Sequence, residues 1–288
     1  MTSPRRIAET ISARIGPVAR HAGVVLRHAA HRALDRYMDG GYQPDAAGTD
    51  SADDSGIELR DVSLAYGAHV ALTGLSGSFA PGSLTAVVGP NGAGKSSLLD
   101  LLAGTKRPNS GEVRCPARTR RRLAFLPQQA EIDRDYPVTV GELVALGLWR
   151  SFGALRAPAA DAAQRVAAAV AAVGLESLTA RRIGELSVGQ MQRVLFARLM
   201  LQEASVILLD EPFAAVDERT TADLLALVAR WHGERRTVIA VIHDLAQVRA
   251  HFPAVLLLAR APIAWGPTAS VLTEANLARA REAVQVQP

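Results

Sequence analysis

Short apolar runs recur along most of the chain between polar and helical stretches, and they predict a sheet of buried strands. The clearest runs are residues 84–88, 206–209 and 238–242. Continuous apolar strands of this length are typical of a parallel sheet that helices cover on both faces. Residues 57–62 instead alternate between apolar and polar positions, as in a half-buried strand. The pattern therefore predicts an α/β fold with a small antiparallel β part at its front.

Helical patterns dominate residues 139–201, where apolar positions recur at helical spacing. The strongest of them is the Ala-rich stretch 158–173, which Gly174 closes. A shorter helix is predicted at 96–103 and is closed by Gly104. We therefore expect a helical subdomain inserted at about 139–201 into the main domain, which spans 57–288.

Two pieces precede the main domain. For residues 1–39 the sequence predicts a basic helical extension, because Ile7, Ile11 and Ile15 recur at helical spacing among arginines, and Pro17 interrupts the pattern. A basic amphipathic segment of this kind suits either a solvated face or a membrane surface. Residues 40–56 are rich in Gly, Ser and Asp and predict a flexible linker.

The amino-acid composition excludes few classes of protein. The formal net charge of +4 would suit nucleic acid or an anionic membrane surface, and it is too small to decide between them. We expect no nucleic-acid partner. A single cysteine, Cys115, excludes an internal disulfide and a cysteine metal cluster. No run approaches the roughly 18 apolar residues of a membrane helix, and no secretory signal is recognisable. These features predict a protein of the cytoplasm.

A glycine-rich stretch after the apolar run 84–88 fits the pattern Gly-x-x-x-x-Gly-Lys-Ser. Between a strand and a helix, such a loop points its amides at phosphate oxygens, and the helix adds its positive N-terminal end. Lys95 brings a full charge to the outer phosphates, and the Ser96 hydroxyl can ligate Mg²⁺. An ordinary glycine-rich turn would explain neither residue. The loop comprises Gly89, Pro90, Asn91, Gly92, Ala93, Gly94, Lys95, Ser96 and Ser97.

Two other apolar runs end in chemically active side chains. Run 206–209 ends in Asp210 and Glu211, and run 238–242 ends in His243. Adjacent carboxylates at the end of a parallel strand are costly unless a cation or catalysis uses them. Asp210 could hold Mg²⁺ and Glu211 could polarise a water. His243 could donate a hydrogen bond to a terminal phosphate.

The stretch Leu-Ser-Val-Gly-Gln at 186–190 predicts the start of a helix. Ser187 as N-cap with Gln190 three residues later makes a capping box, and Leu186 with Met191 makes a hydrophobic staple. A helix N-terminus with free amides and a serine hydroxyl also suits an anion.

Together these motifs resemble the ATP-binding cassette ATPases, over about residues 57–280. The resemblance implies a P-loop NTPase fold, with a RecA-like parallel core, an antiparallel β subdomain and an inserted helical subdomain. It implies ATP hydrolysis with Mg²⁺ held by Ser96, Gln128 and Asp210. By the same resemblance, Tyr66 stacks on adenine, Gln128 rather than Gln129 senses Mg²⁺ and γ-phosphate, Glu211 is the general base and His243 is the switch histidine.

The family also works as a head-to-tail dimer. Ser187, Gly189 and Gln190 of one cassette would contact the ATP bound to the other, and residues 214–217 match the loop that crosses the interface. Val188 departs from the family, which usually has Gly at that position of the signature.

Finer similarities point to one branch of the family. Residues 130–140 and 266–277 resemble the ATPases of zinc- and manganese-type importers, with siderophore-iron importer ATPases as the nearest alternative. This resemblance implies a membrane permease, a second copy of this chain, an extracytoplasmic substrate-binding protein as indirect partner, and a place at the cytoplasmic face of the cell membrane. Within residues 129–152 we expect a groove for a permease helix, lined by some of Tyr136, Val140, Leu143, Trp149 and Phe152. A place in the hydrophobic core is the better interpretation for any single one of these side chains. A soluble non-transport cassette ATPase is the alternative from another class.

Overall fold

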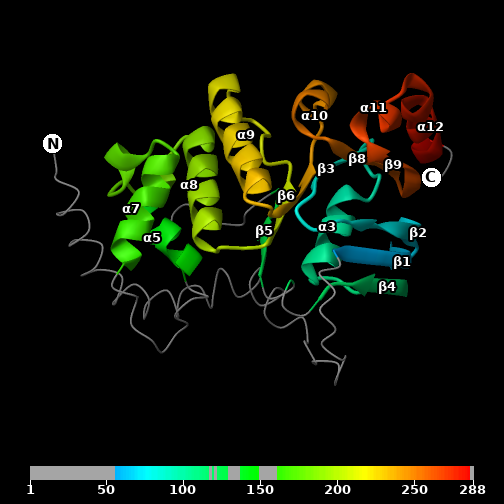
Figure 1. The fold of residues 1–288 in the computed structure, drawn as a ribbon, viewed down its shortest axis with the longest axis horizontal. Coiled ribbons are helices and arrows are strands. Elements are labelled where there is room, and N and C mark those ends of the chain that lie inside the picture. Colours follow the sequence, from blue (N-terminus) through cyan, green and yellow to red (C-terminus); the bar gives the residue numbers. More distant parts are fainter. Residues whose placement is uncertain (1–55, 117–118, 120–121, 129–136, 149–160, 286–288) are drawn as a thin grey trace, which may run out of the picture. The chain divides into compact units, whose positions relative to one another are not determined.

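The computed structural model describes residues 56–116, 119, 122–128, 137–148 and 161–285 (Figure 1). The predicted extension 1–39 and all but the last residue of the linker 40–56 lie outside the described residues. The described chain divides into two compact units. One comprises described parts of Gln129–Ala204 and Phe213–Ala226, and the other comprises described parts of Asp39–Gln128, Ser205–Pro212 and Leu227–Pro288.

The second unit contains a six-stranded sheet in the order β5-β6-β7-β3-β8-β9. Neighbouring strands are parallel except for the hairpin of β8 and β9. Every residue of β3, β6 and β7 is buried, as the apolar runs predicted. The strands are β3 (Leu84–Val88), β5 (Leu123–Leu126), β6 (Val206–Asp210), β7 (Thr237–Val241), β8 (Ala254–Ala259) and β9 (Ala261–Pro267).

A three-stranded antiparallel sheet in the order β2-β1-β4 belongs to the same unit. Its strands are β1 (Ile57–Tyr66), β2 (His69–Phe79) and β4 (Ser110–Arg114). Ile57, Leu59, Val62 and Leu64 of β1 are buried, whereas Arg60 is exposed. The alternating pattern at 57–62 therefore predicted the strand and its buried side correctly.

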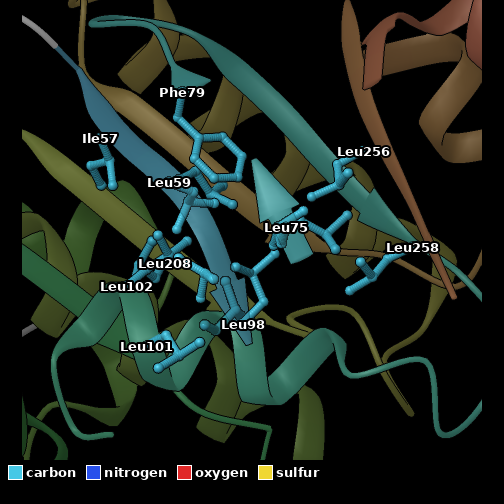
Figure 2. Packing of buried hydrophobic residues seen from close by; sticks show 14 of the residues in the cluster. Ile57, Leu59, Leu75, Phe79, Leu98, Leu101, Leu102, Leu208, Leu256 and Leu258 are labelled. Carbon is cyan, nitrogen blue, oxygen red and sulfur yellow. The ribbon is translucent and has the colours of Figure 1, made fainter. Parts of the chain in front are cut away.

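One hydrophobic cluster joins the two sheets of this unit (Figure 2). Leu59, Leu75 and Phe79 come from the antiparallel sheet, and Leu208 and Leu256 come from the parallel one. Helix α3 (Lys95–Ala103) adds Leu98, Leu101 and Leu102 to the cluster. Helix α3 follows the phosphate loop and is packed on one side into this core. The core therefore fixes the end of the loop that leads into the helix.

The remaining helices of the second unit follow its strands in the chain. They are α10 (Leu245–His251), α11 (Thr268–Val271), α12 (Glu274–Gln285) and the last part of α9 (Glu218–Gly233). Asp244 caps α10, because its carboxylate accepts from the amides of Ala246 and Gln247. None of the helices in the described part of the chain is long and apolar enough to cross a membrane.

The described part of the first unit is helical. Its elements are α5 (Val140–Ala145), η1 (Leu146–Leu148), α7 (Ala162–Ala172), η2 (Glu176–Leu178), η3 (Ile183–Glu185), α8 (Val188–Leu201) and the first part of α9. Helix α7 lies within the predicted stretch 158–173, is preceded by Asp161 and ends just before Gly174. The buried faces of α5, α7 and α8 pack against one another.

Candidate nucleotide site

Topology brings the predicted phosphate and catalytic residues to one edge of the parallel sheet. In the order β5-β6-β7-β3, the carboxyl ends of adjacent strands lead to Gln128, to the pair Asp210 and Glu211, to His243 and to the phosphate loop. Ligands of open α/β sheets bind outside the carboxyl ends of the strands. The parallel pairing therefore gathers side chains from distant parts of the sequence, such as Lys95, Gln128 and His243.

The phosphate loop is closely packed against two other segments. A Cβ atom at Gly89 would lie 2.0 Å from the carbonyl oxygen of Leu258, and one at Gly94 would lie 2.3 Å from that of Ala71. The amide of Arg260, in the turn between β8 and β9, donates to the carbonyl of Ala93 at 2.9 Å. The glycines at these two positions are required because backbone carbonyls already occupy the space of a side chain.

Lys95 is the first residue of α3 and is buried at 7% exposure. Its Nζ donates to the carbonyls of Gly89 and Pro90 at 2.9 and 3.0 Å, within its own loop. Burial lowers the pKa of Lys95, while Glu211 and Asp210 act in the opposite direction. The ammonium group is thus held at the loop, beside the position where the predicted phosphates would lie.

Ser96 and Asp210 are two of the three residues predicted to hold Mg²⁺, the third being Gln128. Asp210 is 4% exposed, and one of its oxygens, Oδ1, is buried without a hydrogen-bond partner. Burial raises the pKa of Asp210, and a hydrogen bond with Ser96 partly offsets this effect. A buried carboxylate oxygen beside a hydroxyl is the hard-oxygen set that Mg²⁺ prefers. The residues present therefore fit a magnesium ion bound together with ATP.

Glu211 lies between Gln128 and His243. Gln128 Nε2 donates to Glu211 Oε2 at 2.7 Å, and His243 Nε2 is 2.5 Å from Glu211 Oε1. Glu211 has φ of 48°, in the left-handed region that a residue with a side chain rarely adopts. Strain of this kind costs about 1–3 kcal/mol and persists where the surroundings fix the backbone.

Tyr66 ends β1 and, within the described part of the chain, is one of the few large hydrophobic residues that are exposed, at 42%. Its hydroxyl donates to Ser97 Oγ at 3.4 Å, and the ammonium of Lys106 lies 5.5 Å from its ring centroid. An exposed ring beside the phosphate loop suits the stacking role that the resemblance implied. The approach of Lys106 was not predicted, because 40 residues separate it from Tyr66 and it belongs to no motif.

The predicted signature forms the start of α8, in the helical unit. Ser187 Oγ accepts from the amide of Gln190 at 3.2 Å, and Gln190 Oε1 accepts from the amide of Ser187 at 3.0 Å. The capping box is therefore confirmed, and the staple residues Leu186 and Met191 are both buried. Val188 is the first helical residue and is 47% exposed.

The site residues thus fall into two groups. The strand-end residues and the phosphate loop belong to one unit, and Ser187, Gly189 and Gln190 belong to the other. Gln129 lies outside the described residues, and so do Tyr136, Trp149 and Phe152 of the expected permease groove. Val140 and Leu143 of that groove are buried at 0% and 4%, so they are core residues of the helical unit.

The contacts that β8 and the turn before β9 make with the phosphate loop were also not predicted from the sequence. Leu258 and Arg260 lie more than 160 residues after the phosphate loop and match no motif. An apolar strand followed by a short turn carries no signal of what its carbonyls will contact. Only the position of β8 next to β3 in the sheet reveals the contact.

Comparisons with known proteins show the family of this chain. The family model described as ABC transporter matches residues 62–214. The manganese transport system ATP-binding protein MntB of Listeria monocytogenes is 35% identical over 77% of this chain and 94% of its own length. The zinc transport system ATP-binding protein TroB of Treponema pallidum is 38% identical over 78% of this chain and 86% of its own.

A solved dimeric structure of a bacterial ABC transporter cassette has the same fold. Its TM-score is 0.66 at 24% identity, and the match covers 74% of this chain and 98% of that one. This chain belongs to the ABC transporter family, as one of its ATP-binding cassettes. It is an ATP hydrolase with the α/β fold of a P-loop NTPase.

Proposed function

We propose that this chain powers the import of a zinc- or manganese-type metal ion through a separate membrane permease. The observation that carries the proposal is the arrangement of Gln128, Asp210, Glu211 and His243 beside the phosphate loop. The chain is also 34–38% identical to ATP-binding proteins of manganese and zinc transport systems. The arrangement supports hydrolysis, and the relatives support the metal.

The roles of the residues follow from their places. Lys95 and the amides of the phosphate loop bind the phosphates, and the ring of Tyr66 stacks on adenine. Ser96, Asp210 and Gln128 would hold Mg²⁺, which would supply positive charge against the phosphates. Glu211 takes a proton from the attacking water, and His243 keeps the carboxylate oriented and donates to the terminal phosphate.

Two copies of the chain close around ATP. The capped N-terminus of α8 presents Ser187 Oγ and free amides, which suit the phosphates of ATP bound to the other copy. In that arrangement neither copy has a complete site alone. We expect a homodimer whose closure depends on ATP.

The remaining partners are implied by the transport function. A permease in the membrane receives the movement of the two cassettes, and an extracytoplasmic protein delivers the metal to that permease. The chain itself then sits at the cytoplasmic face of the cell membrane. The cassette touches ATP and the permease rather than the metal ion.

The test is reconstitution with the membrane subunit that co-purifies with this chain. We expect ATP-dependent uptake of radioactive zinc or manganese into vesicles, and no uptake with the Glu211→Gln variant in the same preparation. Uptake of a ferric siderophore and not of the free metals would assign the transporter to iron instead. Co-purification with ribosomes or DNA, and with no membrane subunit, would contradict a transport function.

A further inference from the structure

Arg193 of α8 connects three segments of the helical unit. Its Nη1 donates to the carbonyl of Val173, at the end of α7, at 3.1 Å. Its Nη2 donates to Thr220 Oγ1 at 3.0 Å and to Asp223 Oδ2 at 2.8 Å, both on α9. The Arg193 side chain is 19% exposed. The planar guanidinium suits this task because it offers several donors in one fixed geometry.

Thr220 extends this connection to the loop 214–217. Its hydroxyl accepts from Arg193, so its single proton is directed to Asp217 Oδ2, at 2.8 Å. The amide of Thr220 donates to Asp217 Oδ1 at 2.9 Å. The pKa of Asp217 is lowered, first by this amide, then by the Thr220 hydroxyl, with a smaller contribution from the charge of Arg193. The last residue of the loop is therefore fixed by a chain of hydrogen bonds that begins on α8.

The same loop lies against the first turn of α8. A Cβ atom at Gly189 would be only 3.4 Å from Asp217 Oδ2. Within the loop, Ala215 has φ of 55°, in the left-handed region. A residue in that region needs surrounding contacts to hold it there. The loop is thus strained on one side and anchored through Asp217 on the other.

A purely structural role for Arg193 is the simpler interpretation of some of these contacts. The bond to Val173 packs α8 against α7, and a salt bridge to the half-exposed Asp223 contributes little to stability. The bond to Thr220 is different, because it leads to the loop rather than to the core. The two roles differ in what the loss of Arg193 changes: folding in one case, and the surface formed by the loop and α8 in the other.

We propose that Arg193 is a positioning residue for ATP hydrolysis. It holds the loop 214–217 against the start of α8, so that Ser187, Gly189 and Asp217 meet the second cassette as one rigid surface. Arg193 does not touch ATP. The inference rests on the proposed function, because it requires two cassettes that close around ATP.

The experiment starts from the Glu211→Gln variant, which should form an ATP-dependent dimer that gel filtration with light scattering detects. Adding Arg193→Gln should raise the ATP concentration needed for half-maximal dimer by about tenfold or more, as expected for the loss of a hydrogen bond to a charged group. Binding of a fluorescent ATP analogue to the monomer should stay unchanged. The matched control is Arg165→Gln, which removes an ion pair with Glu203 in the same unit but no contact to the loop, and it should dimerise like the parent.

Two further variants separate positioning from folding. Thr220→Val breaks the same chain of hydrogen bonds. The double variant with Arg193→Gln should therefore need only slightly more ATP for half-maximal dimer than the more impaired of the two single variants. Arg193→Lys should fall between the parent and Arg193→Gln, because one ammonium cannot reach all three acceptors. If Arg193→Gln lowered thermal stability but the folded protein still formed the dimer like the parent, this inference would be overturned and the proposed function would stand. If the Glu211→Gln parent itself formed no dimer with ATP, the proposed function would fail as well.

Discussion

Gln128 donates a hydrogen bond of 2.7 Å from its side-chain amide to Glu211, across the ends of two neighbouring strands. His243 contacts the other carboxylate oxygen of Glu211 from the next strand, β7. Both carboxylate oxygens of the predicted general base are therefore engaged by neighbouring side chains. For Glu211 to accept a proton from water, one of these two contacts would have to break.

The first prediction concerns Glu211. Glu211→Gln keeps the shape of the side chain but cannot take a proton, so turnover should fall by about 10²–10⁴-fold, as expected for the loss of a general base. ATP binding should be retained, because the phosphate loop and Tyr66 are untouched. Steady-state ATPase rates and nucleotide titrations check both parts. Near-normal turnover would show that another group activates the water.

The second prediction concerns Asp210, whose Oδ1 is buried and unpaired. Asp210→Asn removes the charge that would balance Mg²⁺, so added Mg²⁺ should no longer tighten ATP binding, and hydrolysis should be lost. ATP affinity measured with EDTA should change little, because Lys95 and the loop amides remain. The Glu211→Gln variant is the control, since it should keep the full effect of Mg²⁺. An unchanged effect of Mg²⁺ in Asp210→Asn would move the metal to other ligands.

The third prediction compares two glycines of the phosphate loop. A Cβ at Gly89 would clash with the carbonyl of Leu258, whereas one at Gly92 would meet nothing within 4 Å. Gly92 has φ of 78°, so Gly92→Ala should cost only the left-handed strain of about 1–2 kcal/mol. Gly89→Ala should displace the loop from β8 and lower ATP affinity by at least about tenfold more than Gly92→Ala. Thermal melts and ATP titrations of both variants decide; equal effects would mean that the contact with Leu258 is unimportant.

Much of this site could be predicted from the sequence because its signals are local. Each of these signals spans only a few consecutive residues. They are the phosphate loop, the apolar runs that lead to Asp210 and His243, and the capping box of Ser187. Local hydrogen bonds and continuous burial leave patterns that a single sequence displays. The fold class followed from the same short stretches.

The rest depended on contacts between distant segments. No sequence pattern predicts that Arg260 donates to the phosphate loop, that Lys106 lies near the ring of Tyr66, or that Arg193 donates to Thr220. For a related reason the sequence left open whether Val140 and Leu143 line the expected groove or belong to the core, and the structure shows that both are core residues. Apolar residues on a short helix fit a binding groove and a core equally well, and only the packing of α5 against α7 and α8 distinguishes the two.

The fourth prediction concerns the N-terminal extension and linker. Ile57 is 1% exposed and pairs with Phe79, so the folded domain needs β1 from its first residue. A chain that begins at Ser55 keeps this strand whole, and we expect it to bind and hydrolyse ATP like the full chain. ATPase assays of both chains without permease check the expectation. Failure of the shortened chain to bind ATP would show that residues 1–54 are part of the ATPase domain.

The last prediction concerns Val188, which stands where the family usually has Gly. The structure places it at the first helical position after the cap Ser187, where a β-branched residue fits the backbone. Its amide remains one of the free donors at the helix end, and its two methyl groups are exposed on the surface that would close over ATP. Val188→Gly should therefore keep the fold and leave turnover equal or higher, because only bulk is removed.

Ser187→Arg is the opposite test at the neighbouring position. A long charged side chain in place of the capping hydroxyl should block closure and stop hydrolysis, while ATP binding to the phosphate loop of the same chain persists. ATPase rates of both variants, measured with the permease present, separate steric closure from a specific role of the valine. A collapse of activity in Val188→Gly would show that the valine side chain makes a contact that closure requires, since bulk alone can only hinder it.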